Sequence, residues 1–139
     1  MRYRTTIPRV LVVDDDPDYR LMVRQILLSR DIDVETADGA FGLSARLLNE
    51  PHIDLVLLDC MMPGLTGPAV LGVLGRNPRL SHIPLLLMSV APHADAVAAA
   101  AAHPRARFVE KPARLRDLVT LVEATLKAPP GSTPPTPAR

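Results

Sequence analysis

The stretch Asp54-Leu-Val-Leu-Leu-Asp59 decides the fold of this chain. Four consecutive branched apolar residues lie between two carboxylates, with no alternation of apolar and polar side chains. A run of this kind is typical of a strand that is buried on both faces, as strands are in a parallel sheet covered by helices. Asp59 then stands at the carboxyl end of that strand, where an open α/β sheet binds its ligands.

Similar apolar runs recur on either side of this stretch, at residues 10–13, 34–37, 83–88 and 108–109. The runs at 10–13 and 83–88 are also continuous, so we expect them to be central strands. The runs at 34–37 and 108–109 are shorter or more polar, as edge strands are. The sequence therefore predicts five strands.

Helix start signals separate these runs. Asp16 precedes Pro17, which predicts a cap followed by the first helical residue. Asp38-Gly39 is predicted to cap a second helix that holds Phe41, and Thr66-Gly67-Pro68 to open a third. A fourth helix is expected over residues 94–102, where alanine predominates, and a fifth from about 113. Strand and helix alternate throughout, which predicts an α/β fold with a doubly wound, five-stranded parallel sheet and right-handed crossovers.

Composition limits the class of protein. The 139 residues suit one domain, expected over residues 8–127, followed at 128–139 by a proline-rich flexible tail or linker. With 16 basic and 15 acidic residues the formal charge is +1, which argues against a nucleic-acid-binding domain. No uninterrupted apolar stretch approaches the roughly 20 residues of a membrane span. A single cysteine fits a reducing compartment, so we expect a cytoplasmic protein with no membrane partner.

Polar residues mark the carboxyl ends of the predicted strands. They are Asp14, Asp15, Asp59, Ser89 and Lys111. The three carboxylates exceed the one ammonium by two charges, and like carboxylates resist ionisation together unless a cation lies among them. Mg²⁺ would supply that charge and prefers oxygen ligands. A carboxylate beside Mg²⁺ can act as a nucleophile toward phosphorus, while an ammonium and a hydroxyl stabilise the phosphoryl oxygens.

These residues lie in four stretches that resemble the receiver (CheY-like) domain of bacterial two-component response regulators. The stretches are residues 10–17 (VLVVDDDP), 54–64 (DLVLLDCMMPG), 84–89 (PLLLMS) and 108–112 (FVEKP). The resemblance covers residues 8–127. It implies the flavodoxin-like sheet order 2-1-3-4-5 with five flanking helices.

The resemblance also implies a role for each site residue. Asp59 would accept a phosphoryl group from a histidine kinase, a phosphotransfer protein or a small phosphodonor. Asp15 would bind Mg²⁺ directly, Asp14 largely through water, and Met61 through its carbonyl oxygen. The remaining roles concern the phosphoryl group and the response to it: Lys111 would contact the phosphoryl group, Ser89 would move toward it, and Phe108 would be the aromatic switch.

The function implied is a phosphorylation-controlled switch in a phosphorelay, not a metabolic enzyme. Its only catalysis would be its own phosphorylation and dephosphorylation. The output would pass through the fourth helix, fifth strand and fifth helix, by homodimerisation or through another partner.

Two alternatives stay open at this stage. A small Mg²⁺-dependent phosphohydrolase of the haloacid dehalogenase type would use Asp14 and Asp16, but it leaves Asp59 unexplained. A receiver-fold docking module could act without phosphorylation. Val90 stands where a smaller alanine is usual in the family and could restrict access to Asp59, which favours the second alternative.

Overall fold

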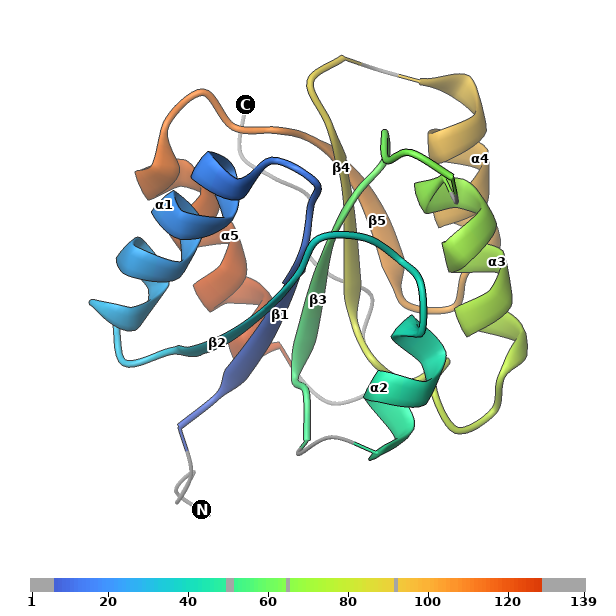
Figure 1. The fold of residues 1–139 in the computed structure, drawn as a ribbon, viewed down its shortest axis with the longest axis horizontal. Coiled ribbons are helices and arrows are strands. Elements are labelled where there is room, and N and C mark those ends of the chain that lie inside the picture. The colour runs from blue at the N-terminus through green and yellow to red at the C-terminus, as the bar shows by residue number, and fades with distance from the viewer. Residues whose placement is uncertain (1–6, 50–51, 65, 92, 129–139) are drawn as a thin grey trace.

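The computed structural model describes residues 7–49, 52–64, 66–91 and 93–128, and within them it has five parallel strands (Figure 1). The strand order is β2-β1-β3-β4-β5, which confirms the predicted doubly wound sheet. The strands are β1 (Arg9–Val13), β2 (Asp33–Ala37), β3 (Leu55–Asp59), β4 (Leu85–Ser89) and β5 (Ala106–Glu110). Residues 129–139 of the predicted tail lie outside the described part of the chain.

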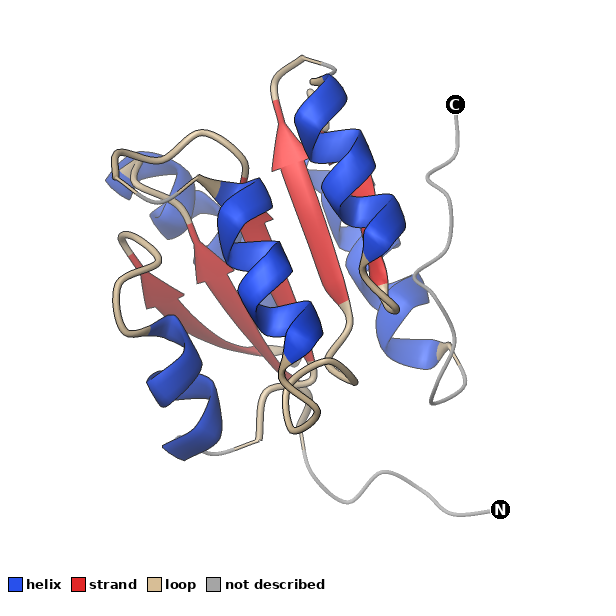
Figure 2. Cartoon of the chain, turned by 90° about the vertical axis from the view of Figure 1, so that its right-hand side faces the viewer, coloured by secondary structure: helices blue, strands red, loops and turns tan. Residues whose placement is uncertain are grey.

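Five helices connect and cover these strands in the described ranges: α1 (Pro17–Leu28), α2 (Leu43–Asn49), α3 (Gly67–Arg76), α4 (Ala94–Ala102) and α5 (Leu115–Lys127). Helices α1 and α5 cover one face of the sheet, and α2, α3 and α4 cover the other (Figure 1). Figure 2 turns this second face toward the viewer and shows helices lying in front of the strands.

The continuous apolar runs are explained by this three-layer arrangement. In β1, Val10 and Val12 belong to the core cluster under α1 and α5, called here the α1/α5 cluster. Leu11 and Val13 belong to the core cluster under α2, α3 and α4, called here the α2–α4 cluster. Side chains of a strand alternate between the two faces, so a strand covered on both sides needs apolar residues at every position.

Helix α4 consists mostly of alanine. Ala96 and Ala100 are buried against the α2–α4 cluster, whereas Val97 is exposed. Alanine has the best intrinsic helix propensity, and the burial of Ala96 and Ala100 supplies the packing that so short a helix still needs.

The second helix begins later than the sequence predicted. Helix α2 starts at Leu43, and Asp38-Gly39 does not cap it. Gly42 has φ +72°, a left-handed conformation that breaks the helical path just before Leu43. Phe41 therefore lies outside the helix, and its side chain is 99% exposed.

Gly67 joins the first turn of α3 to the strand that ends in Asp59. Its N–H donates to the carbonyl oxygen of Cys60 at 3.0 Å. A Cβ atom at this position would lie 2.8 Å from the Asp59 carbonyl oxygen, 2.8 Å from Cys60 Cα and 2.7 Å from Leu87 Cδ1. Two of these three atoms are backbone, so only glycine permits this approach without displacing β3.

We expect Gly67→Ala to lower the free energy of unfolding by about 1–3 kcal/mol, the usual cost of overpacking. Urea denaturation measures this change. Gly39→Ala is the matched control, because a Cβ there meets no atom within 4 Å and the change should be within about 0.5 kcal/mol of zero. Equal effects of the two substitutions would contradict the close approach.

His103 is a buried histidine at the end of α4, away from the carboxyl ends of the strands. Its Nδ1 accepts a hydrogen bond from the Arg105 backbone N–H at 2.9 Å. Its Nε2 is buried and has no hydrogen-bond partner among the residues that the structure describes. Burial lowers the pKa of His103 from its ordinary 6.5, so the folded protein holds a neutral ring.

This histidine predicts a loss of stability in mild acid. Between the lowered folded pKa and 6.5, the unfolded chain binds more protons than the folded chain, so acidification favours unfolding. The free energy of unfolding should therefore fall as the pH drops below about 6.5. Denaturation of wild type and His103→Asn between about pH 7.5 and 5.5 measures the effect, since Asn keeps an acceptor for Arg105 without titrating. Identical pH profiles would contradict it.

Candidate functional site

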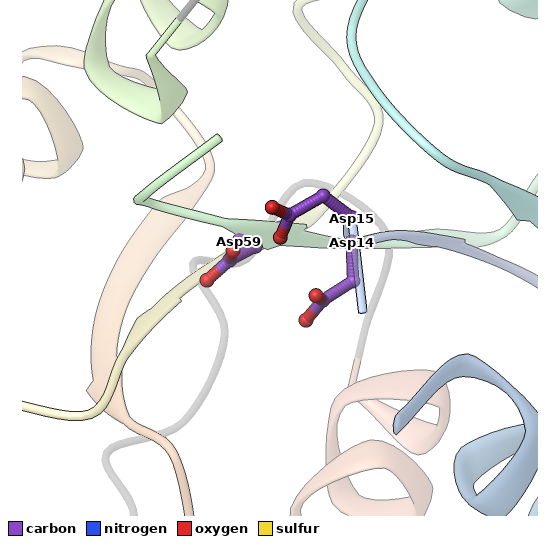
Figure 3. A group of neighbouring side chains, drawn as sticks. All are labelled: Asp14, Asp15 and Asp59. Atoms are coloured by element: carbon purple, nitrogen blue, oxygen red, sulfur yellow. The ribbon is translucent and has the colours of Figure 1, made fainter. Parts of the chain in front are cut away.

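Three aspartates meet at the carboxyl edge of the sheet. Asp14 follows the last residue of β1, and Asp59 is the last residue of the adjacent strand β3. Each of Asp14, Asp15 and Asp59 offers a carboxylate oxygen within 4.8 Å of the others (Figure 3). Asp14 is 1% exposed and Asp59 6%, whereas Asp15 is exposed. The group is therefore an acidic pocket with two buried carboxylates and one at its opening.

Lys111 supplies a positive charge inside this acidic pocket. Its Nζ donates to Asp14 Oδ2 at 2.8 Å and lies 3.3 Å from Asp59 Oδ1. Its backbone N–H donates to the Ser89 carbonyl oxygen at 2.7 Å, which continues the pairing of β4 with β5 beyond the strand ends. The sheet thus brings together two groups, Asp14 and Lys111, that are 97 residues apart in the sequence.

The charges of the pocket shift two pKa values. The pKa of Asp59 is raised, first by burial and then by the negative charge of Asp14, against the lowering effect of Lys111. Burial alone would lower the pKa of Lys111, but its hydrogen bond to Asp14 and the charges of both carboxylates raise it overall. An excess of negative charge therefore remains in the pocket, which a divalent cation would relieve.

Asp16 and Arg20 hold the loop that carries the first two aspartates. The Asp16 side chain caps α1 by accepting from the Asp18 N–H at 3.0 Å, and the Asp16 N–H donates to Asp14 Oδ1 at 3.0 Å. Arg20 Nη1 donates to the Asp14 carbonyl oxygen at 2.6 Å. Asp16 is thus a helix cap, and the orientation of the Asp14 carboxylate is fixed by both Asp16 and Lys111.

The other predicted site residues lie around the pocket. Ser89 is buried at the end of β4, one residue beyond the pair formed by Asp59 and Met88. Met61 follows β3 in the loop toward α3, with an exposed side chain. Val90 is 80% exposed, so its side chain lies largely in solvent.

Phe108 lies in the middle of β5, opposite Leu87 of β4. It is partly buried and packs against the α2–α4 cluster, on the face of the sheet that α4 covers. The structure therefore places Phe108 two residues before the carboxyl end of β5, with its side chain against the core that includes Ala96 and Ala100 of α4.

One residue near the pocket was missed by the sequence analysis. Lys111 Nζ lies 4.4 Å from the centroid of the Tyr19 ring. Burial raises the pKa of the Tyr19 phenol, and the Lys111 charge offsets this only in part, so the ring is neutral. The sequence shows an aromatic residue in the first turn of the helix after Asp16, but nothing in it indicates a contact with Lys111.

No helix in the described ranges is long and apolar enough to cross a membrane.

Comparisons with solved structures define the class of protein. A response regulator receiver protein from Pseudomonas putida is 27% identical, with a TM-score of 0.76 over 86% of this chain and 98% of that one. TrrA from Thermotoga maritima, in complex with Mg²⁺ and BeF, is 25% identical, with a TM-score of 0.71 over 84% and 96% of the two chains. The chain therefore has the CheY-like receiver fold.

Sequence comparisons identify the family. The family model for the response regulator receiver domain matches residues 10–123, and the chain belongs to this family. The DNA-binding response regulator MtrA of Mycolicibacterium smegmatis is 33% identical over 120 residues, which are 86% of this chain and 50% of MtrA. The sensor histidine kinase TmoS of Ectopseudomonas mendocina is 35% identical over 92 residues, 66% of this chain and 9% of TmoS. The chain thus spans half or less of these two curated relatives.

Residues 10–123 therefore form a receiver domain, and the receiver family consists of phosphorylation-controlled switches of two-component signalling rather than classical enzymes. Receiver domains bind Mg²⁺ at their acidic pocket and interact with histidine kinases or phosphotransfer proteins. Neither the phosphohydrolase nor the phosphate-independent docking module is favoured by these findings.

The raised pKa of Asp59 predicts that its charge destabilises the metal-free protein. We expect Asp59→Asn to raise the free energy of unfolding by about 1 kcal/mol at pH 7 without metal, because the substitution removes one of two buried like charges and keeps the shape. Urea denaturation in the presence of a chelator measures this.

The matched control is Asp16→Asn. It removes the same charge from an exposed residue outside the pocket and keeps a good helix cap, so its effect should be near zero. A destabilised Asp59→Asn protein would contradict the electrostatic account.

Proposed function

We propose that Asp59 is the phosphoacceptor of this receiver domain and that Lys111 and Ser89 stabilise the transferred phosphoryl group. The observation that carries the proposal is the bridge formed by Lys111 Nζ between Asp14 and Asp59 in a buried pocket. A partly buried ammonium that already faces the proposed nucleophile is preorganised to meet the charge that arrives with a phosphoryl group.

We propose that Asp14, Asp15 and Asp59 hold Mg²⁺, together with the main-chain carbonyl of Met61. The donor set supports this, because the carboxylate oxygens lie within 4.8 Å of one another and Mg²⁺ prefers such ligands while keeping several waters. Asp15 is exposed, so this side of the site is open to those waters. When bound, the ion would neutralise the excess negative charge of the pocket and the charge of the phosphoryl oxygens.

The transfer itself needs little from the protein beyond position and charge. An Asp59 carboxylate oxygen attacks phosphorus and a new O–P bond forms. The bond from phosphorus to the donor breaks, and its electron pair leaves with the histidine nitrogen of a kinase or phosphotransfer protein, or with the oxygen of a small phosphodonor. The nucleophile must be ionised, and Lys111 favours that state of Asp59. Hydrolysis of the acyl phosphate would complete the domain's own slow catalysis.

The new charge would act through Ser89 and Phe108. A phosphoryl group adds about two negative charges and three acceptor oxygens. Ser89, buried at the edge of the pocket, would donate to one of these oxygens and move toward it. Phe108 would then turn inward and change the face formed by α4, β5 and α5, which we propose as the output surface and as the place where a homodimer would form.

We further propose that this domain contacts no nucleic acid itself, because its formal charge of +1 provides no basic excess. A cytoplasmic location fits the single free thiol of Cys60.

Phosphorylation of Asp59 is tested by intact-mass spectrometry. With Mg²⁺ and acetyl phosphate, we expect the wild type to gain the mass of one phosphoryl group. Asp59→Asn should gain none, because its amide is not a nucleophile. Asp14→Asn should be modified more slowly, because it loses a proposed Mg²⁺ ligand and the hydrogen-bond partner of Lys111.

The control is Asp16→Asn, which removes a charge next to the site and keeps the cap of α1. It should be phosphorylated like the wild type. A wild type that gains no mass, or an Asp59→Asn protein that still does, would overturn the proposal.

A further inference from the structure

Tyr19 presents its ring to the ammonium of Lys111 from the first turn of α1. The distance from Lys111 Nζ to the ring centroid is 4.4 Å, within the range of a cation–π interaction. The ring also packs against the α1/α5 cluster, so it is supported from behind by the core of the protein. The lysine therefore has a third neighbour in addition to the two carboxylates of the acidic pocket.

The hydroxyl group of Tyr19 makes no favourable contact in the described ranges that would explain a tyrosine at this position. The Tyr19 phenolic oxygen is buried and has no hydrogen-bond partner within the described part of the chain. A buried polar group without a partner costs free energy, so the hydroxyl is unfavourable where it stands. The favourable contacts of the side chain are those of its ring.

The backbone ties Tyr19 to the same turn that orients Asp14. The Tyr19 N–H donates to Asp16 Oδ1 at 3.4 Å, while the Asp16 N–H donates to Asp14 Oδ1 at 3.0 Å. The aromatic ring and the carboxylate that hold Lys111 are therefore set by one short hydrogen-bonded segment. A lysine side chain has four rotatable methylene groups and no preferred direction of its own, so such a frame limits where its charge can lie.

We propose that Tyr19 is a positioning residue that holds the Lys111 ammonium in the acidic pocket through the face of its ring. The attraction of the ring does not depend on the charge of Asp14 or Asp59. It therefore persists when a metal ion or a phosphoryl group neutralises or occupies those carboxylates. Its consequence for phosphoryl binding rests on the function proposed above for Lys111, whereas the contact between ring and ammonium does not.

Nuclear magnetic resonance can test the contact directly, because the chain has two lysines, Lys111 and Lys127. Protein labelled with ¹³C and ¹⁵N in lysine should give one ε-methylene signal for each. We expect the Lys111 signal of the wild type to be shifted upfield by the ring current of Tyr19. Tyr19→Phe should keep this shift and Tyr19→Leu should lose it, while the Lys127 signal stays unchanged as an internal reference.

Beryllofluoride binding in the presence of Mg²⁺ tests the consequence for function. Loss of a partly desolvated cation–π contact predicts about three- to tenfold weaker binding by Tyr19→Leu. Tyr19→Phe should bind at least as tightly as the wild type, because it keeps the ring and removes the unpartnered hydroxyl. Leu28→Ala, at the far and partly exposed end of α1, controls for a general loss of helix stability and should bind like the wild type.

The outcomes separate this inference from the proposed function. An unchanged Lys111 signal in Tyr19→Leu, or equal losses in the Phe and Leu variants, would overturn the role of the ring. If the wild type bound no beryllofluoride while the Lys111 shift still depended on the ring, positioning by Tyr19 would be supported and the proposed phosphoryl site would fail.

Discussion

The ion pair between Lys111 and Asp14 is the constraint on which the rest of the site depends. It joins the segment after β5 to the segment after β1 across the whole sequence of the domain, at 2.8 Å. Without the ammonium, the buried carboxylates of Asp14 and Asp59 would lose the cation that contacts them both, and a buried charge without a partner is costly. The pair therefore stabilises the folded state. It also leaves Asp59 next to a cation that is shared with Asp14.

The parallel sheet brings Asp14 and Lys111 together, and the apolar core on both faces of the sheet holds the strands that carry the site. Because all five strands run parallel, their carboxyl ends meet at one edge, and right-handed crossovers place helices on both faces. The strand carrying Asp59 is buried on both sides, and α3 approaches its backbone through Gly67. The Asp59 carboxylate is thus attached to a fully buried strand, while Asp15, Met61 and Val90 lie in more exposed loops around it.

Much of the fold was predictable from the sequence, because a strand buried on both faces leaves an unambiguous apolar run and because carboxylates at strand ends must share an edge. The four motifs predicted the strand order, which the structure confirms, and they contain the charged residues that the structure brings together, Asp14, Asp59 and Lys111. The start of α2 was not predictable from Asp38-Gly39, since the left-handed turn at Gly42 depends on how the loop closes. Tyr19 was missed because a helical aromatic residue gives no sign in the sequence that it will meet a lysine from the far end of the chain.

Helix α4, which belongs to the proposed output face, consists mostly of alanine and so has few side chains that interlock with their neighbours. Its alanine side chains have no rotamers to rearrange, so a small translation or rotation of the helix disengages no interlocked side chains and costs almost no side-chain entropy. Ala96 and Ala100 are the residues of this helix that are buried in the α2–α4 cluster. We therefore expect α4 to shift as one body in response to a change in the core beneath it, more readily than a helix whose side chains interlock with their neighbours.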